Sequence, residues 1–145
     1  MSKVGEIERK TQDRIVMLLA NDLKYDYLGN FQDREDNSNI EVELLKSHLT
    51  DRGYSEVLIS RAVAELIKTA GDQNRSLYDV NKDVYQLLRY GAKQKEEVGK
   101  QKDTVHFIDW EKPNNNTFSF AEEVSIRGEN TKRPDIVLYI NGIAI

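Results

Sequence analysis

The sequence contains no cysteine, which excludes disulfide bonds and thiolate chemistry in these 145 residues. No apolar run approaches the ~18 residues of a membrane span, and the charged start of the chain lacks the pattern of a secretory signal peptide. A Gly-rich phosphate loop is also missing, so we do not expect this segment to bind ATP through one. These absences predict a cytoplasmic protein with no membrane partner.

An excess of positive charge is lacking too. The net charge is −4 and the isoelectric point is near 5.3, which is not the electrostatic footprint of a dedicated nucleic-acid binder, although local basic patches remain compatible with it. His48 and His106 are isolated, and no cysteine accompanies them to complete a zinc site. The apolar fraction of 39% is enough for a core, and one domain is the default for this length.

Helical periodicity dominates the first two thirds of the chain. It predicts a first helix over residues 7–23, with Ile15, Leu18, Leu19 and Leu23 on its inward stripe. The segment 25–37, rich in aromatic and acidic residues, is expected to be a loop. Tyrosines fall mostly at packing positions, so we expect them in the core rather than on a surface that stacks bases. Three further helices are each marked by a capping residue before them and a glycine after them, and they span Ser38 or Asn39 to Gly53, Ser55 to Gly71, and Ser76 to Gly91.

The periodicity becomes β-like after a polar linker. Strand patterns cover residues 104–110, 118–126 and 134–140, and the last of these is apolar on both faces, as in a central strand. Helices followed by strands predict an α+β fold with the first strands of a mixed sheet. We expect a single domain over 1–145, with a helical part at about 6–91, a linker at about 92–103 and a strand part at 104–145.

The sequence ends shortly after a predicted reversal of the chain. Asn141-Gly142 predicts a two-residue hairpin turn, because both residues tolerate positive φ, and Ile143 then begins a partner strand. A partner strand of only three residues leaves its neighbour half paired. We therefore expect the chain to be the front part of a larger protein, and its sheet edge to favour a dimer.

Asp135 is the first candidate for a functional residue. An ionisable side chain at the start of an otherwise apolar strand is costly to bury unless a metal or a partner compensates its charge. The alternative is a strand-end aspartate that faces solvent or bonds a turn. A divalent metal that activates water for phosphodiester cleavage needs at least two carboxylates, and Asp135 would be one of them.

Two segments carry a resemblance to a known family. Phe120-Ala121-Glu122-Glu123-Val124 and the run from Arg133-Pro134-Asp135 to Asn141-Gly142-Ile143-Ala144 resemble the amino-terminal nuclease region of type I restriction enzyme R (restriction) subunits. The segments Ser76–Asp79, Leu87–Gly91 and Ile108–Trp110 resemble parts of the same region. The resemblance runs from about Glu8 to the last residue.

The resemblance implies a restriction-endonuclease-like core of the PD-(D/E)xK type. Asp135 would bind the catalytic Mg²⁺, and the next strand would carry a Glu-x-Lys motif, which lies beyond Ile145. It further implies a hydrolase that cleaves double-stranded DNA, an ATP-driven translocase in the remainder of the subunit, and a complex with modification and specificity subunits. The alternative hypothesis is non-enzymatic: the four helices form a docking module for partner subunits, and the strands support it.

Family cores of this type often add a glutamate from the first helix. Glu8 is the candidate, because Glu8, Gln12, Ile15 and Leu19 share one helical face. Acids in a first helical turn are also favoured by the macrodipole alone, so a structural role stays open.

The remaining candidates lie near the strand ends. Glu122 and Glu123 should alternate, so that one faces the site and the other is exposed, and a catalytic role for either is the less expected outcome. Arg127, Lys132 and Arg133 would contact DNA phosphates, although a basic surface cluster of this size is common.

Overall fold

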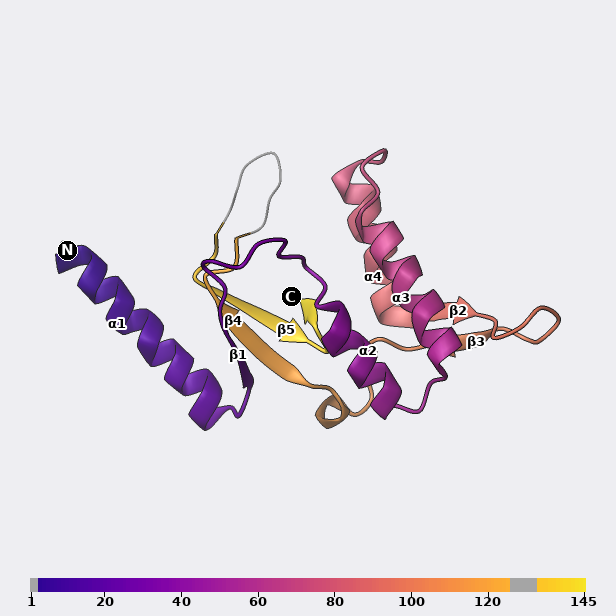
Figure 1. Cartoon of the computed structure of the whole chain (residues 1–145), viewed down its shortest axis with the longest axis horizontal. Coiled ribbons are helices and arrows are strands. Elements are labelled where there is room, and N and C mark those ends of the chain that lie inside the picture. Colours follow the sequence, from indigo (N-terminus) through magenta and orange to yellow (C-terminus); the bar gives the residue numbers. More distant parts are fainter. Residues whose placement is uncertain (1–2, 126–132) are drawn as a thin grey trace. The chain divides into compact units, whose positions relative to one another are not determined.

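The computed structural model describes residues 3–125 and 133–145, which form two compact units (Figure 1). Unit 1 contains residues 1–39 and 117–145, and unit 2 contains residues 40–116. Helices and strands in both units confirm the α+β class. A single domain over the whole chain stays a prediction.

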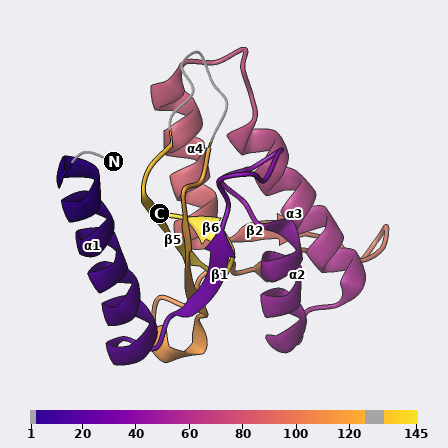
Figure 2. The ribbon, with the colours of Figure 1, turned by 60° about the vertical axis from the view of Figure 1, so that its left-hand side comes forward.

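Unit 1 consists of a long helix and a four-stranded mixed sheet. In the sheet order β1-β4-β5-β6, β1 runs parallel to β4 and the other neighbours are antiparallel. Helix α1 lies beside this sheet (Figure 2). The elements are α1 (Lys3–Met17), the π-helical turn η1 (Leu18–Asp22), β1 (Asp26–Asn30), β4 (Phe118–Glu122), β5 (Ile136–Ile140) and β6 (Ile143–Ala144).

Strands β4 and β5 are stabilised by apolar packing on one face of the sheet. Ala121, Val124, Val137 and Tyr139 form a buried cluster. Val137 and Tyr139 alternate along β5, and Ala121 pairs with Val137 on the same face. The opposite side of β5 is only half-buried, so the prediction of full cover on both faces holds for one of them. The predicted hairpin turn is confirmed, because Asn141 and Gly142 have φ values of 52° and 86° and Ile140 pairs with Ile143.

Two predictions for unit 1 are wrong. The segment expected to be a loop contains β1, which forms because β4 pairs with it across a long stretch of chain. The inward stripe of the first helix is also wrong: Ile15, Leu18 and Leu23 are 40%, 48% and 52% exposed, and only Leu19 is buried. The π-helical turn η1 accounts for Leu23, which follows it, because i→i+5 bonds rotate the helical face after the turn.

Unit 2 is a set of three helices with a short two-stranded sheet. Helix α3 packs against α2, α4 and both strands, around the fully buried Leu45, Leu49, Ala62 and Leu66. The expected caps of α3 and α4 are confirmed, since the Ser55 and Ser76 hydroxyls accept backbone bonds. The elements are α2 (Val42–Asp51), α3 (Glu56–Ala70), α4 (Leu77–Tyr90), β2 (Ala92–Gln94), β3 (Asp103–Val105) and the 3₁₀ turn η2 (Pro113–Asn115).

Three boundaries in unit 2 differ from the prediction. Helix α2 has Glu41 at its N-cap, because the chain still forms a strand-type bridge at Ile40. The expected linker contains β2, and the expected strand over 104–110 is reduced to β3. Gly91 connects α4 to β2 with a φ of 85°, and an added Cβ would lie 2.7 Å from the Val105 carbonyl oxygen. A side chain at position 91 would therefore disturb the β2–β3 pairing.

No helix within residues 3–125 and 133–145 is long and apolar enough to cross a bilayer.

Candidate functional site

Asp135 lies at the surface of unit 1, immediately before β5. The residue is exposed, and its backbone carbonyl accepts a 3.0 Å hydrogen bond from the Glu123 N–H. The carboxylate is therefore solvated, and the cost of burying a charge does not arise for it. The backbone bond fixes the Asp135 backbone beside Glu123, at the start of β5.

Glu122 is the buried carboxylate of this region. It is 3% exposed at the end of β4. The Tyr27 hydroxyl donates to its Oε1 over 2.7 Å, Gln12 Nε2 donates to its Oε2 over 2.6 Å, and Arg9 Nη1 lies 3.4 Å from Oε2. A buried charge needs this kind of compensation, because an unpaired carboxylate in the interior is strongly disfavoured.

Glu123 turns toward the same amide as Glu122. Gln12 Nε2 lies 3.2 Å from its Oε1, and Arg133 Nε lies 3.1 Å from its Oε2. The expectation that one of the two glutamates is exposed is wrong, since the Glu123 side chain is only 15% exposed. Strand geometry stops at Glu122, and Glu123 has a φ of 55°, so the alternation of side chains no longer applies there.

The network perturbs Tyr27. Its hydrogen bond to Glu122, together with partial burial and the negative charge of that carboxylate, raises the pKa of Tyr27 to about 12, while Arg9 opposes the shift. Ionising the phenol would place a second negative charge against a buried carboxylate. Tyr27 therefore acts as a hydrogen-bond donor at neutral pH.

The first helix reaches this site through Gln12, which shares the predicted face with Glu8, and through Arg9. Glu8 is exposed, whereas Gln12 is half-buried and donates to both glutamates. Arg9, three residues before Gln12, contacts Glu122 and also pairs with Asp13 at 2.9 Å. The i, i+3 spacing of a cation and an amide on α1 was a signal in the sequence, but nothing local identified their partners. A catalytic role for Glu8 stays a prediction.

Of the predicted DNA contacts, only Arg133 can be placed. It is exposed and pairs with Glu123. Arg127 and Lys132 lie outside the described residues.

The described carboxylates could supply one ligand to a magnesium ion, but they do not form a complete metal site. In the described part of the chain, no group of three or more His, Cys, Asp or Glu side chains is arranged to hold a metal. Mg²⁺ is commonly bound through one or two carboxylates and keeps several waters. The exposed Asp135 fits one such ligand, whereas both Glu122 oxygens are engaged by protein donors.

The fold and this site define an α+β protein in which an aspartate at a strand start lies next to two glutamates tied to the first helix. Residues 6–145 match the family described as "Type I restriction enzyme R protein N terminus". The chain belongs to this family, which confirms the resemblance. Membership assigns it to a restriction system with other subunits and gives it a nuclease-related role. Comparison with curated proteins and with solved structures gave no match.

Proposed function

We propose that this chain supplies Asp135 to the Mg²⁺-dependent cleavage of double-stranded DNA by a type I restriction enzyme. The observation that carries the proposal is the exposed Asp135 carboxylate, whose backbone is tied to Glu123. A metal ligand must be open to water and substrate yet held in place, and Asp135 meets both requirements.

The neighbouring residues position this aspartate. Gln12 holds Glu122 and Glu123 together and also approaches the Asp135 carbonyl oxygen, at 3.5 Å. Arg133 lies two residues before Asp135 and pairs with Glu123. Its exposed guanidinium is suited to a DNA phosphate. Arg127 and Lys132 are proposed to add phosphate contacts, and Glu8 to add a carboxylate from α1.

Mg²⁺ bound at Asp135 and a glutamate beyond residue 145 would polarise the scissile phosphate and lower the pKa of the attacking water. The proposal places this activity in the cytoplasm, in a complex with modification and specificity subunits and with an ATP-driven translocase in the rest of the R subunit. A dimer through the edge of the sheet stays a prediction.

The test is Asp135→Asn in the assembled restriction complex. We expect DNA cleavage to fall at least about 100-fold, because loss of a ligand should cost no less than loss of the groups that orient one. ATP hydrolysis and the circular dichroism spectrum should be unchanged. Asp13→Asn is the matched control, since it removes an exposed carboxylate that pairs with Arg9 on α1. Cleavage retained by the Asp135 variant would overturn the proposal.

Exposed apolar residues on α1 favour the docking function as a second candidate. Val4, Ile7 and Ile15 are 64%, 65% and 40% exposed and lie on one face of the helix. Apolar surface of this kind often marks a protein interface. Under this hypothesis Ile7→Lys should abolish co-purification with the partner subunits, whereas Lys10→Gln should not, and normal co-purification of the Ile7 variant would exclude α1 as the docking surface.

A further inference from the structure

The outer face of α4 carries aromatic and basic residues in alternation. Tyr78, Lys82, Tyr85 and Arg89 follow one another at steps of four, three and four residues, so they form one stripe along the helix. Tyr78 is 77% exposed and Tyr85 is 55% exposed. The expectation that these tyrosines belong to the core is therefore wrong, because Val80 is the residue that α4 buries in their place.

The stripe keeps its positive charge although α4 also contains acids. Asp83 forms an ion pair with Arg75, and Asp79 accepts a 2.8 Å hydrogen bond from the Ser76 hydroxyl. Each of these aspartates directly follows a stripe residue, so it lies about 100° around the helix from the stripe. Within the part of the chain that the structure describes, neither Lys82 nor Arg89 has a carboxylate partner.

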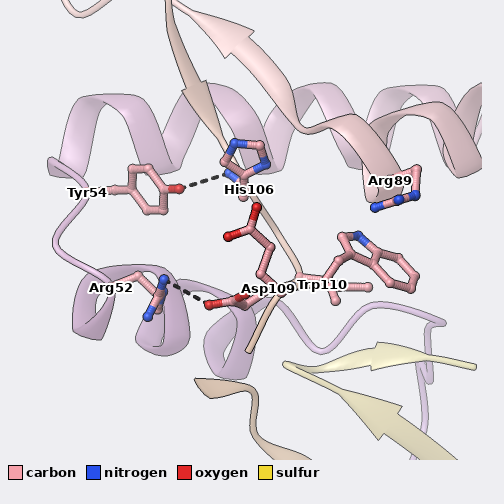
Figure 3. A pocket seen from close by; sticks show the side chains of 8 residues that line it. Arg52, Tyr54, Arg89, His106, Asp109 and Trp110 are labelled. Atoms are coloured by element: carbon pink, nitrogen blue, oxygen red, sulfur yellow. Dashed lines mark hydrogen bonds and ion pairs between the residues drawn. The ribbon is translucent and has the colours of Figure 1, made fainter. Parts of the chain in front are cut away.

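The stripe ends at an aromatic ring. Figure 3 shows the Arg89 guanidinium next to Trp110, and its central carbon lies 5.2 Å from the ring centroid. The Trp110 indole donates a 2.8 Å hydrogen bond to the Leu88 carbonyl oxygen, which fixes the ring against the end of α4. Because Trp110 is still 48% exposed, it keeps surface on which a planar base could stack.

Arg89 and Trp110 line a cavity of about 290 Å³, close to the lower limit of small-ligand pockets. Arg52 also lines it, but its charge is offset by Asp109 at 3.2 Å, and Glu111 adds a further negative charge. The cavity is therefore suited to an uncharged base rather than to a phosphate. Phosphates belong on the stripe itself, at Lys82 and Arg89.

We propose that the α4 stripe, together with Trp110, binds single-stranded DNA. Aromatic rings that stack on bases, alternating with cations that contact the backbone, are the chemistry of single-strand recognition. At ~1.5 Å per residue the stripe is about 16 Å long, enough for several nucleotides. In a duplex the bases are already stacked on one another, so the exposed rings favour a single strand as the occupant.

This inference shares one assumption with the proposed function, namely that DNA is the partner. It requires neither the metal nor cleavage, and every residue of the stripe belongs to unit 2, whereas Asp135 belongs to unit 1.

The experiment is a binding titration of the 145-residue chain without divalent metal. The ligand is an oligothymidine of about 12 nucleotides, within the ~4–16 nucleotides that one single-strand binding fold covers. Trp110 is the only tryptophan, so quenching of its fluorescence reports directly on the stripe, and the anisotropy of a labelled oligonucleotide gives Kd for every variant. We expect saturable quenching, and Kd should rise about tenfold or more in Tyr85→Ala.

Arg89→Gln should weaken binding and reduce the slope of log K against log salt by about 0.7, the value for one phosphate contact with a single strand. Leu77→Ala is the apolar control, because Leu77 is 75% exposed and lies about 100° around α4 from Tyr78. Lys68→Gln is the charge control on α3. Both variants should bind like the original chain.

Several outcomes would overturn the inference. These are absence of saturable binding, unchanged Kd in both Tyr85→Ala and Arg89→Gln, equal or tighter binding of the matching duplex, or full competition by polyglutamate. Asp135→Ala should bind normally. If it does, and cleavage by the complex nevertheless proves independent of Asp135, the proposed function fails while the single-strand surface stands.

Discussion

Replacing Glu122 by alanine should destabilise unit 1 by about 3 kcal/mol, and each contribution follows from a contact. The Tyr27 hydroxyl loses a bond to a charged acceptor, for which ~1.5–3 kcal/mol is typical, and the lower value applies because Tyr27 is 47% exposed. Gln12 loses its shortest hydrogen bond but keeps Glu123, which adds about 1 kcal/mol. Arg9 is half exposed and retains Asp13, so its ion pair contributes at most about 0.5 kcal/mol.

Urea unfolding followed by far-ultraviolet circular dichroism measures this loss. With a slope of about 2 kcal/mol per molar urea, the midpoint should fall by about 1.5 M. Two-state behaviour must be checked in a chain with two compact units, and Trp110 fluorescence gives an independent record of unit 2. Asp13→Ala is the matched control, and it should change stability by less than about 0.5 kcal/mol because both partners of the Arg9–Asp13 pair are exposed.

A loss below about 1 kcal/mol for Glu122→Ala would refute the reasoning, because it would mean that Tyr27 and Gln12 find equally good partners without the carboxylate. A double-mutant cycle with Gln12→Ala separates the pair from its surroundings. The double variant should lose about 1 kcal/mol less stability than the sum of the two single losses, because both single changes remove the same hydrogen bond. Independent, additive effects would show that Gln12 does not connect α1 to β4.

Two further predictions concern pH. Burial and the nearby Arg52 lower the pKa of His48, while Asp51 and Asp109 partly oppose them. The unfolded chain therefore binds a proton that the folded chain resists, and stability should fall as the pH drops below about 6.5. His48→Gln should flatten this part of the unfolding profile, and an unchanged profile would contradict the burial of His48. Tyr27 has its pKa raised from 10.0 to about 12, so its contribution is complete below about pH 10 and is lost as the pH rises toward 12. In a spectroscopic titration, Tyr27→Phe should remove a tyrosinate that forms near pH 12. A late part of the curve that is unchanged in Tyr27→Phe would contradict the Glu122 hydrogen bond.

Local rules in the sequence predicted α3, α4 and the final hairpin well. A serine cap, a run of apolar residues at helical spacing and a terminal glycine lie within one segment, and so does the Asn141-Gly142 turn. Strand β1 could not be predicted in this way. Its sequence Asp-Tyr-Leu-Gly-Asn contains three residues that strands disfavour, and it is held by parallel pairing with β4, which lies far along the chain.

Patterns within one segment also decide which residues of the candidate site could be predicted from the sequence. Asp135 could be selected as a candidate because an acid next to an apolar strand is a local contrast in the sequence. The Glu122 network joins α1, β1 and β4 across sequence separations of 110 and 95 residues, and no periodicity within one element reports such contacts. The helical face that contains Glu8 also contains Gln12, and Gln12 is the residue of this face that contacts Glu122 and Glu123. On that face only the amide can donate to two carboxylates at once, whereas a glutamate in its place would repel them. The α1 residue that contacts both Glu122 and Glu123 is therefore the uncharged Gln12, because a carboxylate there would repel them. Any additional carboxylate that α1 supplies must act farther from this pair of glutamates.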